Sequence, residues 1–147
     1  MMVLSSARVF MAFALVLFAF DASSQDVAMP IIFDTDISSD VDDVGAVALL
    51  HQLADQGDIQ ILAMAVSSGD KWSAPCLAAL NNWFGRPLVP VGRATLPTVK
   101  HVSKYTRIIA ESFKSDTAAV SYEDAVTLYR KTLAAQPDNS VVIVTVG

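Results

Sequence analysis

Five aspartates lie within ten residues of this chain, directly after a short apolar run at positions 30–33. They are Asp34, Asp36, Asp40, Asp42 and Asp43. Like charges this close repel one another, so such a loop persists most readily when a cation or a strongly hydrogen-bonded ligand lies among the carboxylates. The apolar run before the loop and the helical pattern after it place the loop at the carboxyl end of a strand. Open α/β sheets bind ligands there, so the loop is a candidate metal site.

Apolar runs alternate with helical patterns along the rest of the chain. Runs typical of buried parallel strands lie at 30–35, 59–67, 88–92 and 140–147, and helical patterns lie at 42–56, 73–84, 104–113 and 122–135. Strands that alternate with helices build βαβ units. The sequence therefore predicts an α/β fold with an open, mostly parallel sheet and helices on both faces.

Local signals mark several boundaries of these elements. Gly57 is expected to end the first helix, Gly85 the second, and Ser121 with Asp124 to form a capping box at the start of the fourth. The segment at 93–102 has no clear pattern, so both a lid and a plain connector remain open. The last strand-like run stops at position 147, although a buried parallel strand needs cover on both faces. We therefore expect a fold that continues beyond this sequence.

The start of the chain is expected to be absent from the mature protein. Arg8 precedes a 12-residue apolar run at 9–20, and small residues at 22–24 suit cleavage before Gln25. The run is short for a bilayer span. The sequence thus predicts a signal peptide at 1–24 and a mature domain at 25–147 that is secreted or periplasmic, without membrane attachment after cleavage.

Composition excludes several function classes. A net charge of −5 leaves no basic stripe for a phosphate backbone, which disfavours nucleic-acid partners and favours small neutral or cationic ligands. Cys76 is the only cysteine, so an intrachain disulfide and a cysteine-rich zinc site are excluded. Its apolar neighbours predict a buried thiol.

Three simpler interpretations of the aspartate loop are open to comparison. An EF-hand is excluded because Ser39 and Gly45 stand where that loop needs Gly and Glu, and a strand precedes the loop. A phosphatase of the haloacid dehalogenase type would use Asp34 and Asp36 as nucleophile and acid, yet it leaves the other three aspartates without a role. A solvated acidic turn that only complements a helix N-terminus is the third interpretation.

The pairing of Asp34-Thr35-Asp36 with Asp42-Asp43 resembles the N-terminal signature of the inosine-uridine nucleoside hydrolases, in the branch with a longer loop between the two groups. The resemblance continues at 61–70, 81–87, 90–92 and 144–147 and spans essentially all of the mature part. It implies a Rossmann-like nucleoside hydrolase fold, calcium as cofactor, and hydrolysis of the N-glycosidic bond of ribonucleosides to ribose and free base. This chain would be an incomplete catalytic unit, its partner a small nucleoside, and a homo-oligomer is left open.

The resemblance also implies a role for each aspartate. Asp36, Asp43 and the backbone carbonyl of Val146 would bind calcium, and Asp36 would also be the general base that activates water. Asp42 would hold the ribose diol. Asp34 and Asp40 would support the loop. A calcium-dependent ribose-binding module without turnover is the rival outside the enzymes.

Four further positions carry specific expectations. Ser38 stands where the family has a glycine, which predicts strain if that position needs a positive φ. Asp70 stands where the family has a substrate-binding asparagine, and it is a candidate for substrate contact or for capping the next helix. Of the two histidines, His51 is interpreted as structural and His101 as a candidate substrate contact.

Overall fold

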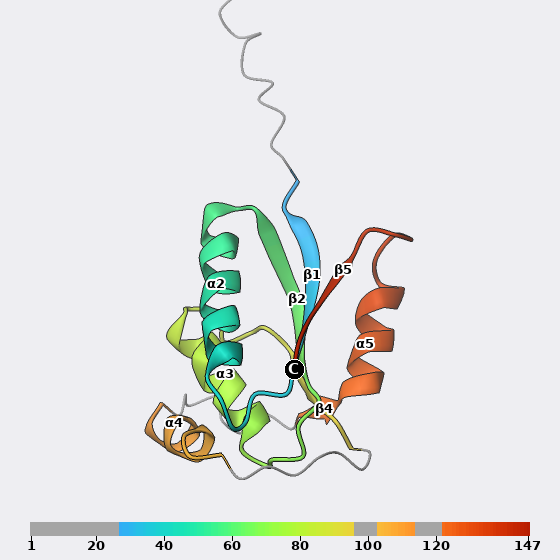
Figure 1. The fold of residues 1–147 in the computed structure, drawn as a ribbon. Helices are drawn as coiled ribbons and strands as arrows, with labels where there is room; N and C mark the ends of the chain where they lie inside the picture. The colour runs from blue at the N-terminus through green and yellow to red at the C-terminus, as the bar shows by residue number, and fades with distance from the viewer. Residues whose placement is uncertain (1–26, 96–102, 114–121) are drawn as a thin grey trace, which may run out of the picture.

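One parallel sheet organises the described part of the chain, which comprises residues 27–95, 103–113 and 122–147 of a computed structural model (Figure 1). The strand order is β4-β3-β2-β1-β5, and every neighbouring pair is parallel. The strands are β1 Met29–Thr35, β2 Ile59–Val66, β3 Val91–Arg93, β4 Glu123–Asp124 and β5 Val142–Val146. The predicted α/β fold is confirmed. The predicted signal peptide and His101 lie outside the described residues.

Helices cover both faces of this sheet. They are α2 Asp42–Gln56, α3 Ser73–Trp83, α4 Thr106–Ser112 and α5 Ala125–Ala134. Helices α2 and α3 lie on one side of the strands and α5 on the other (Figure 1). None of the helices among the described residues has the length and apolar character that a membrane span requires.

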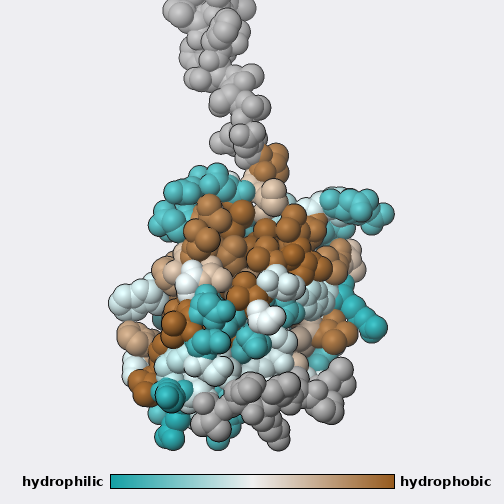
Figure 2. All heavy atoms as spheres, viewed as in Figure 1, coloured by the Kyte–Doolittle hydropathy of each residue, from teal (hydrophilic) through white to brown (hydrophobic). Residues whose placement is uncertain are grey.

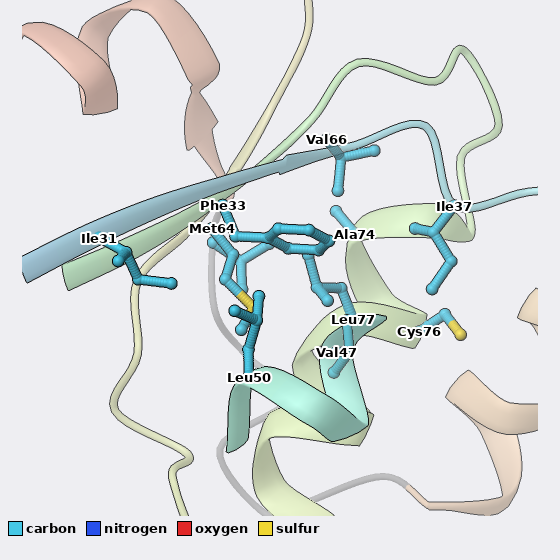
Figure 3. Packing of buried hydrophobic residues seen from close by; sticks show 11 residues of the cluster. Ile31, Phe33, Ile37, Val47, Leu50, Met64, Val66, Ala74, Cys76 and Leu77 are labelled. Atoms are coloured by element: carbon cyan, nitrogen blue, oxygen red, sulfur yellow. The ribbon is translucent and has the colours of Figure 1, made fainter. Parts of the chain in front are cut away.

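Strand β1 is buried from both sides, as a central parallel strand must be. Ile31 and Phe33 point toward α2 and α3, whereas Ile32 between them packs with Leu128 of α5. This alternation follows from the two-residue period of a strand. Figure 3 shows Phe33 in the middle of the larger cluster, between the strands and the helices.

The predicted buried thiol is confirmed. Cys76 lies on α3 within the larger cluster and is fully buried. Burial disfavours the thiolate and raises the pKa of Cys76 to about 12.

Two predicted boundaries are wrong for identifiable reasons. The third strand begins at Val91, not at Leu88, whose side chain is 87% exposed in a turn. Pro90 lacks the N–H that a strand interior donates. The fourth helix begins at Ala125, and its N-cap is Asp124, whose carboxylate accepts from the Thr127 N–H at 3.1 Å. The predicted capping box with Asp124 as its third helical residue is therefore wrong, and Asp124 also belongs to the unpredicted strand β4.

A polar cluster joins α2 to α3. His51 is fully buried, its Nε2 lies 2.9 Å from Asn81 Oδ1, and its ring stacks on Phe84 with centroids 4.7 Å apart. The Arg86 guanidinium faces Nδ1, so Nε2 carries the proton and donates to Asn81. Burial lowers the pKa of His51. The structural interpretation of His51 is thus confirmed.

Exposed apolar side chains gather over the sheet edge formed by β5. Val142 and Ile143 are 43% and 48% exposed. Figure 2 shows hydrophobic residues over this region and hydrophilic residues toward the carboxyl ends of the strands. The polar end of the sheet is where the aspartate loop lies.

Candidate functional site

The carboxyl ends of the strands form a continuous row. Thr35 at the end of β1 pairs with Val66 of β2 on one side and with Val146 of β5 on the other, and Val66 pairs with Arg93 of β3. The aspartate loop leaves β1 at this row and leads into α2. Its first residue, Asp36, donates its backbone N–H to the Val146 carbonyl at 3.3 Å. The loop therefore lies at the carboxyl edge of the sheet, as predicted.

Asp43 is the buried member of the acidic loop. It lies in the first turn of α2 and is fully buried. Its Oδ1 accepts a hydrogen bond from the hydroxyl of Thr35 at 2.5 Å, while Oδ2 has no hydrogen-bond partner among the described residues. An unpaired buried carboxylate oxygen is costly, so this oxygen is available to a ligand.

Asp40, Asp42 and Asp43 form a compact cluster of carboxylates. Each offers an oxygen, and these three oxygens all lie within 4.8 Å of one another. Asp40 and Asp42 are exposed. Burial, followed by repulsion from Asp36, Asp42 and Asp40, raises the pKa of Asp43 to about 6, against the opposing effect of the Thr35 hydrogen bond. An oxygen-only set of this kind fits a hard cation, and with the unpaired Oδ2 it could hold a metal ion.

Asp36 is the first residue of the loop. It is exposed, and its side chain packs against Gly147, where an added Cβ would come within 2.7 Å of Asp36 Oδ1. The structure thus places Asp36 beside the Val146 carbonyl and close enough to raise the pKa of Asp43. The tight cluster contains Asp40 and Asp42 with Asp43, and the assignment of calcium to Asp36, Asp43 and Val146 stays a prediction.

Two aspartates already have partners within the protein. Asp34 Oδ2 accepts from the Tyr129 hydroxyl of α5 at 2.8 Å. Asp70 accepts from the Trp72 N–H at 3.1 Å and from the Thr106 hydroxyl at 2.7 Å, which ties the β2–α3 loop to α4. Asp70 does not cap α3, which begins at Ser73 without a side-chain cap, so that alternative is wrong. Its substrate contact stays a prediction.

The expectation about Ser38 is wrong. Among the described non-glycine residues only Asn139 has a positive φ, so Ser38 needs no glycine-like backbone. Its side chain is 3% exposed, and its hydroxyl has no hydrogen-bond partner in the described structure. Ser38 thus adds a second unpaired buried polar group to the loop.

Neither Asp42 nor Asp43 caps α2. Val41 occupies the cap position and no side chain bonds there, while both aspartates lie in the first helical turn. Carboxylates in the first turn are stabilised by the helix dipole, which partly offsets their mutual repulsion. Capping alone therefore does not account for the acidic loop.

Sequence reasoning missed several residues that hold the loop in place. Thr35 bonds Asp43, Tyr105 donates its hydroxyl to the Asp40 carbonyl, and Tyr129 bonds Asp34. Tyr105 and Tyr129 lie 65 and 95 residues from their partners. A local pattern carries no signal for such contacts. Thr35 stood inside the acidic motif, but its neighbours gave no sign of the bond to Asp43.

Comparisons with known proteins place this chain by fold alone. No protein-family model and no curated protein matches the sequence. Two solved structures resemble it with a TM-score of 0.62 and 20% identity: the effector protein XOO4466, and the type III effector protein XopQ complexed with adenosine diphosphate ribose. The alignments cover 96% and 97% of this chain but 41% and 42% of those chains. The chain thus spans about two fifths of the structures that it resembles.

Asp43→Asn should stabilise the metal-free protein at pH 7.5, because it removes a buried charge beside three other carboxylates. The pKa of Asp43 is raised from 3.8 in the unfolded chain to about 6 in the folded protein. Below pH 3.8 the carboxyl is neutral in both states and does not lower stability, and as the pH rises through 6 its charge in the folded protein makes the wild type less stable. The advantage of the variant should therefore vanish near pH 4. Thermal melts in excess chelator measure it.

In calcium, the wild type should become more stable than Asp43→Asn. At a hundred times its dissociation constant, calcium should stabilise the wild type by about 2.7 kcal/mol and Asp43→Asn much less. Asp55→Asn is the control, because Asp55 pairs with Arg86 away from the loop and should keep the calcium response. Wild-type melting curves that coincide in calcium and in chelator would contradict the proposed metal site.

Proposed function

We propose that this chain forms the calcium- and ribose-binding part of an N-ribosyl hydrolase, which cleaves the N-glycosidic bond of ribonucleosides to ribose and free base. The observation that carries the proposal is the unpaired, fully buried Oδ2 of Asp43 within a cluster of carboxylates at the carboxyl edge of the sheet. The motif resemblance supports the reaction. A structure of the same fold is complexed with adenosine diphosphate ribose, which supports a ribose-containing ligand.

Calcium would be held by Asp43 and by groups that converge on the same edge. Asp36 and the Val146 carbonyl lie side by side at the end of β5, and Asp40 and Asp42 face Asp43. When bound, calcium would coordinate several oxygen atoms and lower the pKa of a bound water.

The exposed carboxylates of Asp36 and Asp42 would take part directly in proton transfer and in ribose binding. Asp36 would take a proton from the water that attacks C1′ of the ribose, as a general base. Asp42 is exposed in the first turn of α2 and would accept hydrogen bonds from the 2′ and 3′ hydroxyls, since a carboxylate only accepts and a diol donates. Nearby carboxylates also stabilise the positive charge that develops on the ribose as the base departs.

The half-buried Asp34 and Asp70 support this arrangement. Asp34 is bonded to Tyr129 and Asp70 to Thr106 and Trp72, so both are engaged in holding loops and helices. The bond to Tyr129 occupies Oδ2 of Asp34, so a phosphatase would have to use the other oxygen as its nucleophile. A binding module without turnover remains the alternative, supported by the bound adenosine diphosphate ribose of the XopQ structure.

In a complete catalytic unit that contains this chain, inosine or uridine should release free base in calcium and none in chelator. Asp36→Asn should reduce the rate by roughly 10²- to 10⁴-fold, the usual contribution of a positioned general base. Chromatography of the free base gives the rate, and Asp55→Asn should match the wild type. Phosphate release from a generic phosphomonoester would favour the phosphatase. Calcium-dependent nucleoside binding without base release would instead favour the binding module.

Asp42 should distinguish ribonucleosides from their deoxy counterparts. A nucleoside without its 2′ or 3′ hydroxyl loses a hydrogen bond to the Asp42 carboxylate, so it should bind more weakly than its ribo counterpart. Asp42→Asn should weaken nucleoside binding and retain most of the calcium affinity. Calorimetric titration measures both, and equal affinities for ribo- and deoxynucleosides would contradict the role of Asp42.

A further inference from the structure

We infer that Thr35 is a positioning residue of the metal site: its hydroxyl holds Oδ1 of Asp43 and so leaves Oδ2 as the oxygen available to a cation. This inference rests on the metal site of the proposed function. It concerns how that site is built, which neither the motif resemblance nor the two similar structures assign.

The direction of the Thr35 hydrogen bond follows from its surroundings. The hydroxyl oxygen of Thr35 accepts from the Ile37 N–H at 3.1 Å. Its single proton is then committed to Asp43 Oδ1, 2.5 Å away. Thr35 and Asp43 are both fully buried, so bulk water does not compete for this bond.

Thr35 provides a rigid support for that bond. It is the last residue of β1, paired with Val66 on one side and Val146 on the other. Its carbonyl accepts from the Ser67 N–H at 2.9 Å and from the Ser67 hydroxyl at 3.2 Å. A β-branched side chain also has few accessible rotamers. The donor therefore belongs to a fixed element of the sheet, while the carboxylate that it holds belongs to α2.

A fixed carboxylate matters because the other groups of the site depend on its orientation. One oxygen of Asp43 already lies within 4.8 Å of oxygens of Asp40 and Asp42. With Oδ1 bonded to Thr35, the carboxylate cannot turn without breaking that bond. Residues that hold a metal ligand in this way typically account for about 10- to 100-fold in metal affinity.

Valine and serine at position 35 separate the hydroxyl from the shape of the side chain. Thr35→Val keeps the branched shape and the strand propensity but removes the donor, whereas Thr35→Ser keeps the donor. Thr145→Val is the matched control, because Thr145 lies on the neighbouring strand opposite Asp34, is exposed, and makes no side-chain hydrogen bond within the described ranges.

Calorimetric titration of the full chain with Ca²⁺ should show a loss of about 10- to 100-fold in affinity for Thr35→Val. Thr35→Ser and Thr145→Val should bind close to the wild type. Melting in chelator reports the fold separately, so a merely structural role would lower the melting temperature without changing the calcium affinity. If valine prevents folding, Thr35→Ala set against Thr35→Ser makes the same comparison.

Two outcomes would overturn the inference. Thr35→Val with wild-type calcium affinity would show that the hydroxyl does not position the ligand. Thr35→Ser as weak as Thr35→Val would show that shape is what matters. A complete catalytic unit that contains this chain and binds calcium but releases no base from inosine or uridine would contradict the proposed function and leave the role of Thr35 supported. A wild type that binds no calcium would overturn both.

Discussion

The buried carboxylate of Asp43 is the constraint on which the candidate site depends. The carboxylate is fully buried and one of its oxygens has no partner among the described residues, although three other carboxylates lie near enough to raise its pKa. The first turn of α2 and the hydroxyl of Thr35 offset only part of this cost. A bound cation would remove both the repulsion and the unpaired oxygen.

The surroundings divide the aspartates into two groups. Asp34 and Asp70 accept hydrogen bonds from side chains of α5 and α4, so they tie distant elements to the carboxyl edge of the sheet. Asp36 and Asp42 remain exposed at that edge. Similar carboxyl groups thus serve as supports or as candidate ligands according to burial and hydrogen bonding.

Much of the fold was predictable because its signals are local. Helix α2 begins and ends where the pattern and Gly57 predicted, and β1 was correctly predicted as a strand buried on both faces. Errors arose where a local signal was ambiguous, as at Leu88, which lies between Pro87 and Pro90, and at Asp124, which serves both a strand and a helix cap. The acidic loop is evident from the sequence, whereas the contacts that Tyr105 and Tyr129 make with the loop depend on tertiary structure.

Crystals grown with calcium and measured at a long wavelength would test the central claim most directly, because the anomalous signal locates the ion itself. A peak roughly 2.3 to 2.6 Å from the Asp43 carboxylate is the expected result, since that is the usual distance of calcium from its oxygen ligands. Thr35 should still be bonded to the other oxygen of Asp43. The absence of a peak at millimolar calcium, or a peak bound only by exposed carboxylates away from Asp43, would contradict the account.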